Sequence, residues 1–109
     1  MPVLDATDAE RQQAARDHTN DEDCLRVAGT TNVQGLATSI AQSIYEGNPP
    51  VLRAIGAGAI NQAQKALAVA RGIVASCGYD LYVKPGFSTF VTESGEDRTA
   101  MTFRVVVDH

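Results

Sequence analysis

The spacing of apolar positions changes several times between residues 25 and 107, and each change marks a new element. Short apolar runs at residues 25–28 and 51–55, each followed by turn residues, predict two strands. After each run the apolar residues recur at intervals of three and four, which predicts helices over about residues 33–46 and 59–76. The positions that set the first helix are Val33, Leu36, Ala37, Ile40, Ala41 and Ile44.

The C-terminal part of the chain reads as two further strands. Residues 79–83 predict a third strand, interrupted at Pro85-Gly86 and continued by residues 87–92 as an extended arm. Residues 93–97 predict a hairpin turn, and residues 99–107 alternate, with Met101, Phe103, Val105 and Val107 on one face. The order strand-helix-strand-helix-strand-strand predicts an α/β two-layer sandwich, with a four-stranded mixed sheet packed against two helices.

The second helix has an unusually wide apolar side. At about 100° per residue, its apolar positions span nearly half the circumference, which is more than a helix on one sheet needs. We therefore predict that part of this helix meets a second copy of the chain, in a homodimer or a higher even oligomer. The candidate interface residues are Ala66, Val69, Ala70 and Ile73.

The most specific motif is residues 54–72, AIGAGAINQAQKALAVARG. A strand, a glycine pair and a helix N-terminus together make a place where an anion can sit. The glycines, the Asn-Gln pair and Ala-Arg-Gly, in this order, resemble the signature of the stage V sporulation protein S family. Residues 78–81 (GYDL), 84–87 (KPGF), 95–100 (GEDRTA) and 103–107 extend the resemblance over residues 25–107, whereas residues 1–23 match nothing in that family.

This resemblance implies an Alba-like fold, because the family is bacterial and related in fold to the Alba chromatin proteins of archaea. It also implies a dimeric, non-enzymatic protein that contacts nucleic acid through residues 29–32, 56–59 and 90–98. Residues 29–32 lack the lysine that relatives often carry there, and the predicted hairpin tip has three acids and one arginine. Any binding of DNA or RNA is therefore expected to be weak and independent of base sequence, or the target is a protein. The candidate nucleic-acid contacts are Thr30, Asn32, Arg53, Gly58, Asn61, Lys65 and Arg98.

Charge divides the 109-residue chain into two parts. Residues 1–23 hold seven acids and two bases, or −5, and residues 24–109 hold six acids and seven bases, or +1; together they give the net −4. Residues 1–23 read as a solvated acidic arm, or as an arm with a short helix over residues 9–17 behind a capping box at residues 7–10. Residues 24–109 form one near-neutral domain, on which Arg26, Lys84, Arg98 and Arg104 look scattered. This balance argues against tight binding of nucleic acid.

The chain offers little for other chemistry. Gly56-Ala-Gly58 lacks the third glycine of a dinucleotide fingerprint, and neither His18 nor His109 has a nearby Cys or His to share a metal ion. Cys24 and Cys77 read as reduced thiols, and no serine or cysteine has a histidine in the domain to activate it. We expect no enzyme activity, cofactor, small-molecule substrate or membrane span, and a cytoplasmic protein. Two hypotheses stay open: a dimeric nucleic-acid-binding regulator of bacterial sporulation or development, and a protein-interaction module of the same fold.

Overall fold

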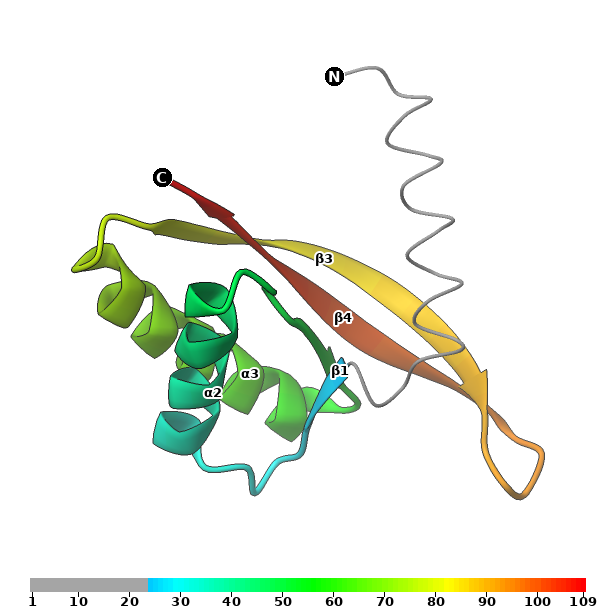
Figure 1. Cartoon of the computed structure of the whole chain (residues 1–109). Coiled ribbons are helices and arrows are strands. Elements are labelled where there is room, and N and C mark those ends of the chain that lie inside the picture. Colours follow the sequence, from blue (N-terminus) through cyan, green and yellow to red (C-terminus); the bar gives the residue numbers. More distant parts are fainter. Residues whose placement is uncertain (1–23) are drawn as a thin grey trace, which may run out of the picture.

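Two helices cover one face of a four-stranded sheet in the computed structural model, which describes residues 24–109 (Figure 1). This is the predicted α/β two-layer sandwich. The acidic arm and its short helix, predicted for residues 1–23, lie outside the described residues. The elements in chain order are β1 (Cys24–Val27), α2 (Val33–Tyr45), β2 (Val51–Ala54), α3 (Ala57–Ala75), β3 (Asp80–Val91) and β4 (Asp97–Asp108).

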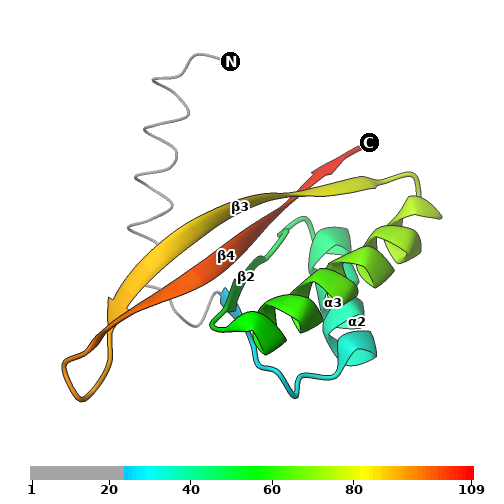
Figure 2. The same cartoon turned by 180° about the vertical axis from the view of Figure 1, so that it is seen from behind.

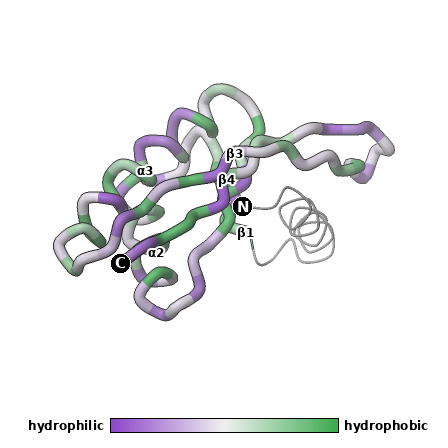
Figure 3. The backbone as a smooth tube through the Cα atoms, turned by 90° about the horizontal axis from the view of Figure 1, so that it is seen from above, coloured by the Kyte–Doolittle hydropathy of each residue, from purple (hydrophilic) through white to green (hydrophobic). Residues whose placement is uncertain are grey.

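The sheet is mixed and its strands differ greatly in length. The spatial order is β1-β2-β4-β3, with β1 parallel to β2 and the other neighbours antiparallel. The four-residue strand β2 pairs with β4 only from Arg104 to Met101, whereas β3 pairs with β4 from Asp80↔Asp108 to Val91↔Asp97. The far ends of β3 and β4 therefore run past the other strands as a two-stranded arm, which Figure 2 shows extending from the body. Figure 3 shows mostly hydrophilic residues at the tip of this arm.

The core lies between the helices and the inner face of the sheet, the face that the helices cover. Ile40 of α2, Leu52 of β2 and Val74 of α3 are the largest fully buried side chains. The predicted face of the last strand is confirmed, since Phe103 and Val105 are buried and Met101 and Val107 pack against the same core. Neither helix among the described residues is long and apolar enough to cross a membrane.

The wide apolar side of α3 is used largely within the chain. This helix contacts α2 as well as strands β1, β2 and β3, so two neighbours on different sides bury it. Ala66 and Ala70 both have 0% of their surface exposed, and the predicted interface is wrong for these two residues, because no surface is left for a second copy. Val69 is half-buried and Ile73 is 37% exposed.

The ends of the helices follow their local sequence, with one difference. Asn32 caps α2, and its side-chain oxygen accepts a 2.7 Å hydrogen bond from the Gly35 amide. Helix α3 begins at Ala57, two residues before the predicted start, because Gly56 takes the N-cap position. Gly56 has a φ of 89°, which favours glycine, and its carbonyl accepts the first helical bond from Ile60 (3.0 Å).

The predicted interruption of the third strand is wrong. Strand β3 continues through Pro85 and Gly86, which pair in register with Phe103 and Thr102. Since β3 lies at an edge of the sheet, it tolerates a proline that would disrupt a central strand. The hairpin turn is confirmed: the Thr92 amide donates to the Glu96 carbonyl (2.8 Å), and Gly95 has a φ of 86°.

Candidate nucleic-acid interface

Four of the predicted contacts lie at the start of the two helices, and the fifth, Lys65, lies about two turns further along α3. An added Cβ on Gly58 would lie 3.6 Å from the Cα of Gly29, so the loop after β1 touches the first turn of α3. The Gln62 side chain also donates to the Thr31 carbonyl (2.9 Å), which holds loop and helix together. This group, called the helix-start cluster below, comprises Thr30, Asn32, Gly58, Asn61 and Lys65.

The helix-start cluster has little charge to offer a phosphate. Lys65 is the only cation among its five residues. The Asn32 side-chain oxygen already accepts the capping hydrogen bond, and the Asn61 side chain donates to the side chain of Gln62 at 3.4 Å. The cluster therefore offers a polar surface and the amides of two helix starts, rather than an electrostatic site.

The other two predicted contacts, Arg53 and Arg98, lie on the opposite face of the sheet. Side chains alternate along a strand, so Arg53 points away from the core that its neighbours Leu52 and Ala54 enter. The same alternation from buried Phe103 places Arg98 on this face, called the outer face below. The predicted contacts are thus divided between the two layers of the molecule.

The strand register gathers cations on the outer face, although they looked scattered in the sequence. Arg26 pairs with Arg53, and Lys84 pairs with Arg104. Paired residues point to the same side of a sheet. Val51, two residues before Arg53, pairs with Arg104, so the row of Arg26 and Arg53 lies next to the row of Lys84 and Arg104. With Arg98, five of the seven cations of residues 24–109 lie on this face. Arg26, Lys84 and Arg104 were missed as candidate contacts. The alternation of side chains shows which residues of one strand share a face, but it does not show which strands are adjacent in the sheet.

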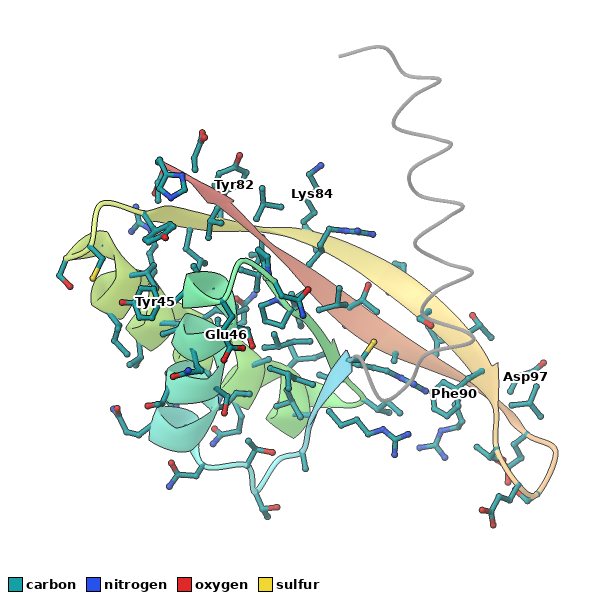
Figure 4. The ribbon with its side chains drawn as sticks, in the orientation of Figure 1. Tyr45, Glu46, Tyr82, Lys84, Phe90 and Asp97 are labelled. Carbon is teal, nitrogen blue, oxygen red and sulfur yellow. The ribbon has the colours of Figure 1, made fainter. Side chains whose placement is uncertain are left out.

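Aromatic side chains lie among these cations. The guanidinium carbon of Arg53 lies 4.1 Å from the centroid of the Phe90 ring, within the range of a cation–π contact. Phe90 itself pairs with Arg98. Tyr82 lies further along β3, and Figure 4 shows Tyr82 and Lys84 pointing away from the helices. The outer face therefore combines positive charge with rings.

Five of the six Asp and Glu residues of residues 24–109 lie at the ends of the sheet, and the sixth, Glu46, ends α2. Asp80 and Asp108 pair at one end of the outer face, where Asp80 lies 3.8 Å from Arg71 in a well-exposed ion pair of small energetic value. Glu93, Glu96 and Asp97 lie at the opposite end, around the tip of the arm. Among residues 24–109, the paired strand positions that form the two central rows of cations include no Asp or Glu.

One polar cluster lies away from the outer face. The Tyr45 hydroxyl donates to the Cys77 sulfur at 3.4 Å, and this hydrogen bond, with a smaller contribution from desolvation, raises the pKa of Tyr45. The Tyr79 ring lies between the rings of Tyr45 and His109, with centroid distances of 5.9 and 4.3 Å. These contacts tie the C-terminal end of α2 to that of α3. Within residues 24–109, no group of three or more His, Cys, Asp or Glu side chains is arranged to hold a metal ion.

The comparison with known families agrees with the motif and the fold. The model of the stage V sporulation protein S (SpoVS) family matches residues 23–108, which include nearly every residue described above. The observed element order and the open mixed sheet are consistent with the Alba-like fold expected of that family. The chain belongs to the stage V sporulation protein S family.

Proposed function

We propose that this protein is a non-enzymatic, dimeric nucleic-acid-binding regulator that acts in the cytoplasm of a sporulating or developing bacterium. Membership of the SpoVS family supports a role related to sporulation. The observation that carries nucleic-acid binding is the gathering of Arg26, Arg53, Lys84 and Arg104 in two neighbouring rows of the outer face.

Binding through this face depends on phosphate rather than on base sequence. Each cation that neutralises a phosphate releases a condensed counterion, so affinity falls as salt rises. The face counts five cations and two terminal carboxylates, a net +3, although the domain as a whole has only +1. Both helices lie on the other side of the sheet, so neither is offered to a major groove from this face. Contacts to phosphate position a protein but carry no sequence information.

The acidic residues 1–23 restrain this binding in our proposal. Their net charge is −5, and they join the domain at Cys24, the first residue of a strand whose Arg26 contributes to the outer face. A segment with that negative charge, joined to the strand that carries Arg26, either repels phosphate or competes with it.

The test is a pair of double variants of the full chain with equal charge change. Arg26→Gln with Lys84→Gln removes two exposed cations from the outer face, and Lys65→Gln with Arg71→Gln removes two exposed cations from α3. Fluorescence anisotropy with labelled DNA and RNA at about 50 mM salt measures affinity and its salt dependence. The outer-face pair is expected to weaken binding about tenfold and to lower the salt slope by roughly 1.4 to 1.8, for two lost phosphate contacts.

Two outcomes would change the proposal. An equal or larger loss in the α3 pair would move the contact to the helix-start cluster. No binding of any nucleic acid by the unaltered chain would favour the alternative function, a protein-interaction module.

One observation favours the alternative function, a protein-interaction module. Phe87 and Val91 are 77% and 64% exposed, and strand alternation places both on the inner side of the arm, away from the outer face. Large exposed apolar side chains on a protruding two-stranded arm favour contact with protein. In our proposal the partner is a second copy of the chain, which leaves both outer faces open to nucleic acid.

A further inference from the structure

We propose that the outer face prefers single-stranded nucleic acid and stacks a base on the pair formed by Arg53 and Phe90. This inference rests on the proposed function, because it names the class of nucleic acid that the same face takes. Of the three segments that the family resemblance implied, residues 90–98 contain Phe90, and we add Arg53 of β2 in the body of the sheet.

The arm is poorly suited to enter a groove of duplex DNA. A two-stranded ribbon has the right width for a major groove of about 12 Å. The tip, however, carries Glu93, Glu96 and Asp97 beside the single cation Arg98. Phosphates line both sides of a groove, so these carboxylates would meet like charge on entry. A duplex can then contact the outer face only through the phosphates of one strand at a time.

A single strand gains more from the outer face because its bases are accessible. The Arg53 guanidinium lies over the Phe90 ring at 4.1 Å, and both side chains are half-buried, so the pair is held in place before any ligand arrives. A base stacks on an arginine plane or an aromatic ring whatever its identity, since every base has a π-face. The base therefore either extends the stack on the guanidinium or exchanges with it on the ring.

Cations lie next to this stacking pair. Arg98 pairs with Phe90 across the arm, and the row of Lys84 and Arg104 lies toward the body of the sheet. Arg98 and Arg104 are six residues apart on β4, or about 20 Å along the strand. Small side chains fill the rows between them: Ser88 pairs with Ala100, and Gly86 pairs with Thr102. A base stacked on Phe90 and Arg53 would thus have one cation for its phosphate beside the ring and others toward the body of the sheet.

The experiment compares two identical substitutions on opposite sides of the arm. Phe90→Leu keeps an apolar side chain but removes the ring from the outer face, and Phe87→Leu does the same on the inner side. Arg53→Lys keeps the charge and removes the guanidinium plane. The full-length variants are titrated with a labelled single strand of about 12 nucleotides and with its duplex at about 50 mM salt. A strand with 2-aminopurine reports stacking directly through its fluorescence.

We expect the unaltered chain to bind the single strand more tightly than the duplex and to quench 2-aminopurine. Phe90→Leu should weaken single-strand binding about tenfold and remove the quenching, with less than a twofold change for the duplex. Arg53→Lys should act in the same direction, and it decides the matter if circular dichroism shows that Phe90→Leu does not fold. Phe87→Leu should behave like the unaltered chain.

The failures of the two proposals differ. Equal affinity for single strand and duplex, or equal losses in Phe90→Leu and Phe87→Leu, would overturn stacking while leaving binding by the cations intact. Absence of any binding would overturn both.

Discussion

The two faces of the sheet have opposite chemistry, although the same strands supply both. The inner face places Leu52, Phe103 and Val105 against the helices and contributes no charged side chain to the core. The outer face turns the alternate residues of these strands outward, and in its central rows they are Arg26, Arg53, Lys84 and Arg104. The inner face needs only apolar residues of suitable size, whereas the outer face depends on which strands become neighbours. The difference teaches that the core can be predicted from the sequence of each strand, whereas a charged surface formed by several strands cannot.

The largest expected effect comes from disturbing the inner layer. Ala66→Glu places a carboxylate where 0% of the native side chain is exposed, which combines overpacking with burial of an unpaired charge. We expect a loss of about 4 kcal/mol or more in the free energy of unfolding, measured by urea denaturation with circular dichroism. Ile73→Glu, at a position that is 37% exposed on the same helix, should cost less than about 1 kcal/mol. A fully stable Ala66→Glu variant would contradict the packing of α3 described here.

A smaller effect is expected where the arm meets a second copy. Replacing Phe87 and Val91 by Ser and Thr removes the apolar surface of the inner side of the arm. Burial of a single such side chain is worth about 1.5 to 3 kcal/mol, so the dissociation constant of the dimer should increase tenfold or more. Sedimentation at micromolar concentrations measures this, with Ile73→Glu as the comparison on α3. Dissociation by Ile73→Glu alone would place the interface on the helix, and a monomer for the unaltered chain would refute the dimer.

The smallest effect concerns the acidic residues 1–23. Asp21→Asn, Glu22→Gln and Asp23→Asn remove three negative charges next to β1 without shortening the chain. We expect binding to tighten about threefold to tenfold at about 50 mM salt, with the gain lost near 1 M salt, where the Debye length is about 3 Å. Deleting residues 1–23 should act in the same direction and steepen the salt dependence. Neutralising Glu93 and Glu96 at the tip of the arm serves as the control and should change binding less. Unchanged affinity in the triple variant would show that residues 1–23 do not restrain the outer face.

Much of the fold followed from local patterns in the sequence. The helical spacing from Val33 to Ile44 and the alternation from Met101 to Val107 reflect a single requirement, namely that apolar residues face one core. The cap at Asn32 is equally local. The interruption predicted at Pro85-Gly86 was wrong because a proline disrupts a central strand but fits an edge, and the position of β3 in the sheet is a tertiary property.

The candidate site was less predictable for the same reason. An arc of alanines fits a second subunit as well as it fits a neighbouring helix, and Ala66 and Ala70 turned out to face the latter. Arg26 and Arg53 are 27 residues apart, and only the pairing of β1 with β2 makes them neighbours. The strand order β1-β2-β4-β3 then brings Arg104 and Lys84 alongside. No spacing in the sequence encodes that order.

The most direct test of the outer face as the binding surface is an NMR titration of the full chain with a short single strand. We expect the largest backbone amide shifts at Arg26, Arg53, Lys84 and Arg104 on the strands, and at Phe90 near the end of the arm. Shifts concentrated instead at the helix-start cluster, around Thr30, Gly58 and Asn61, would contradict it.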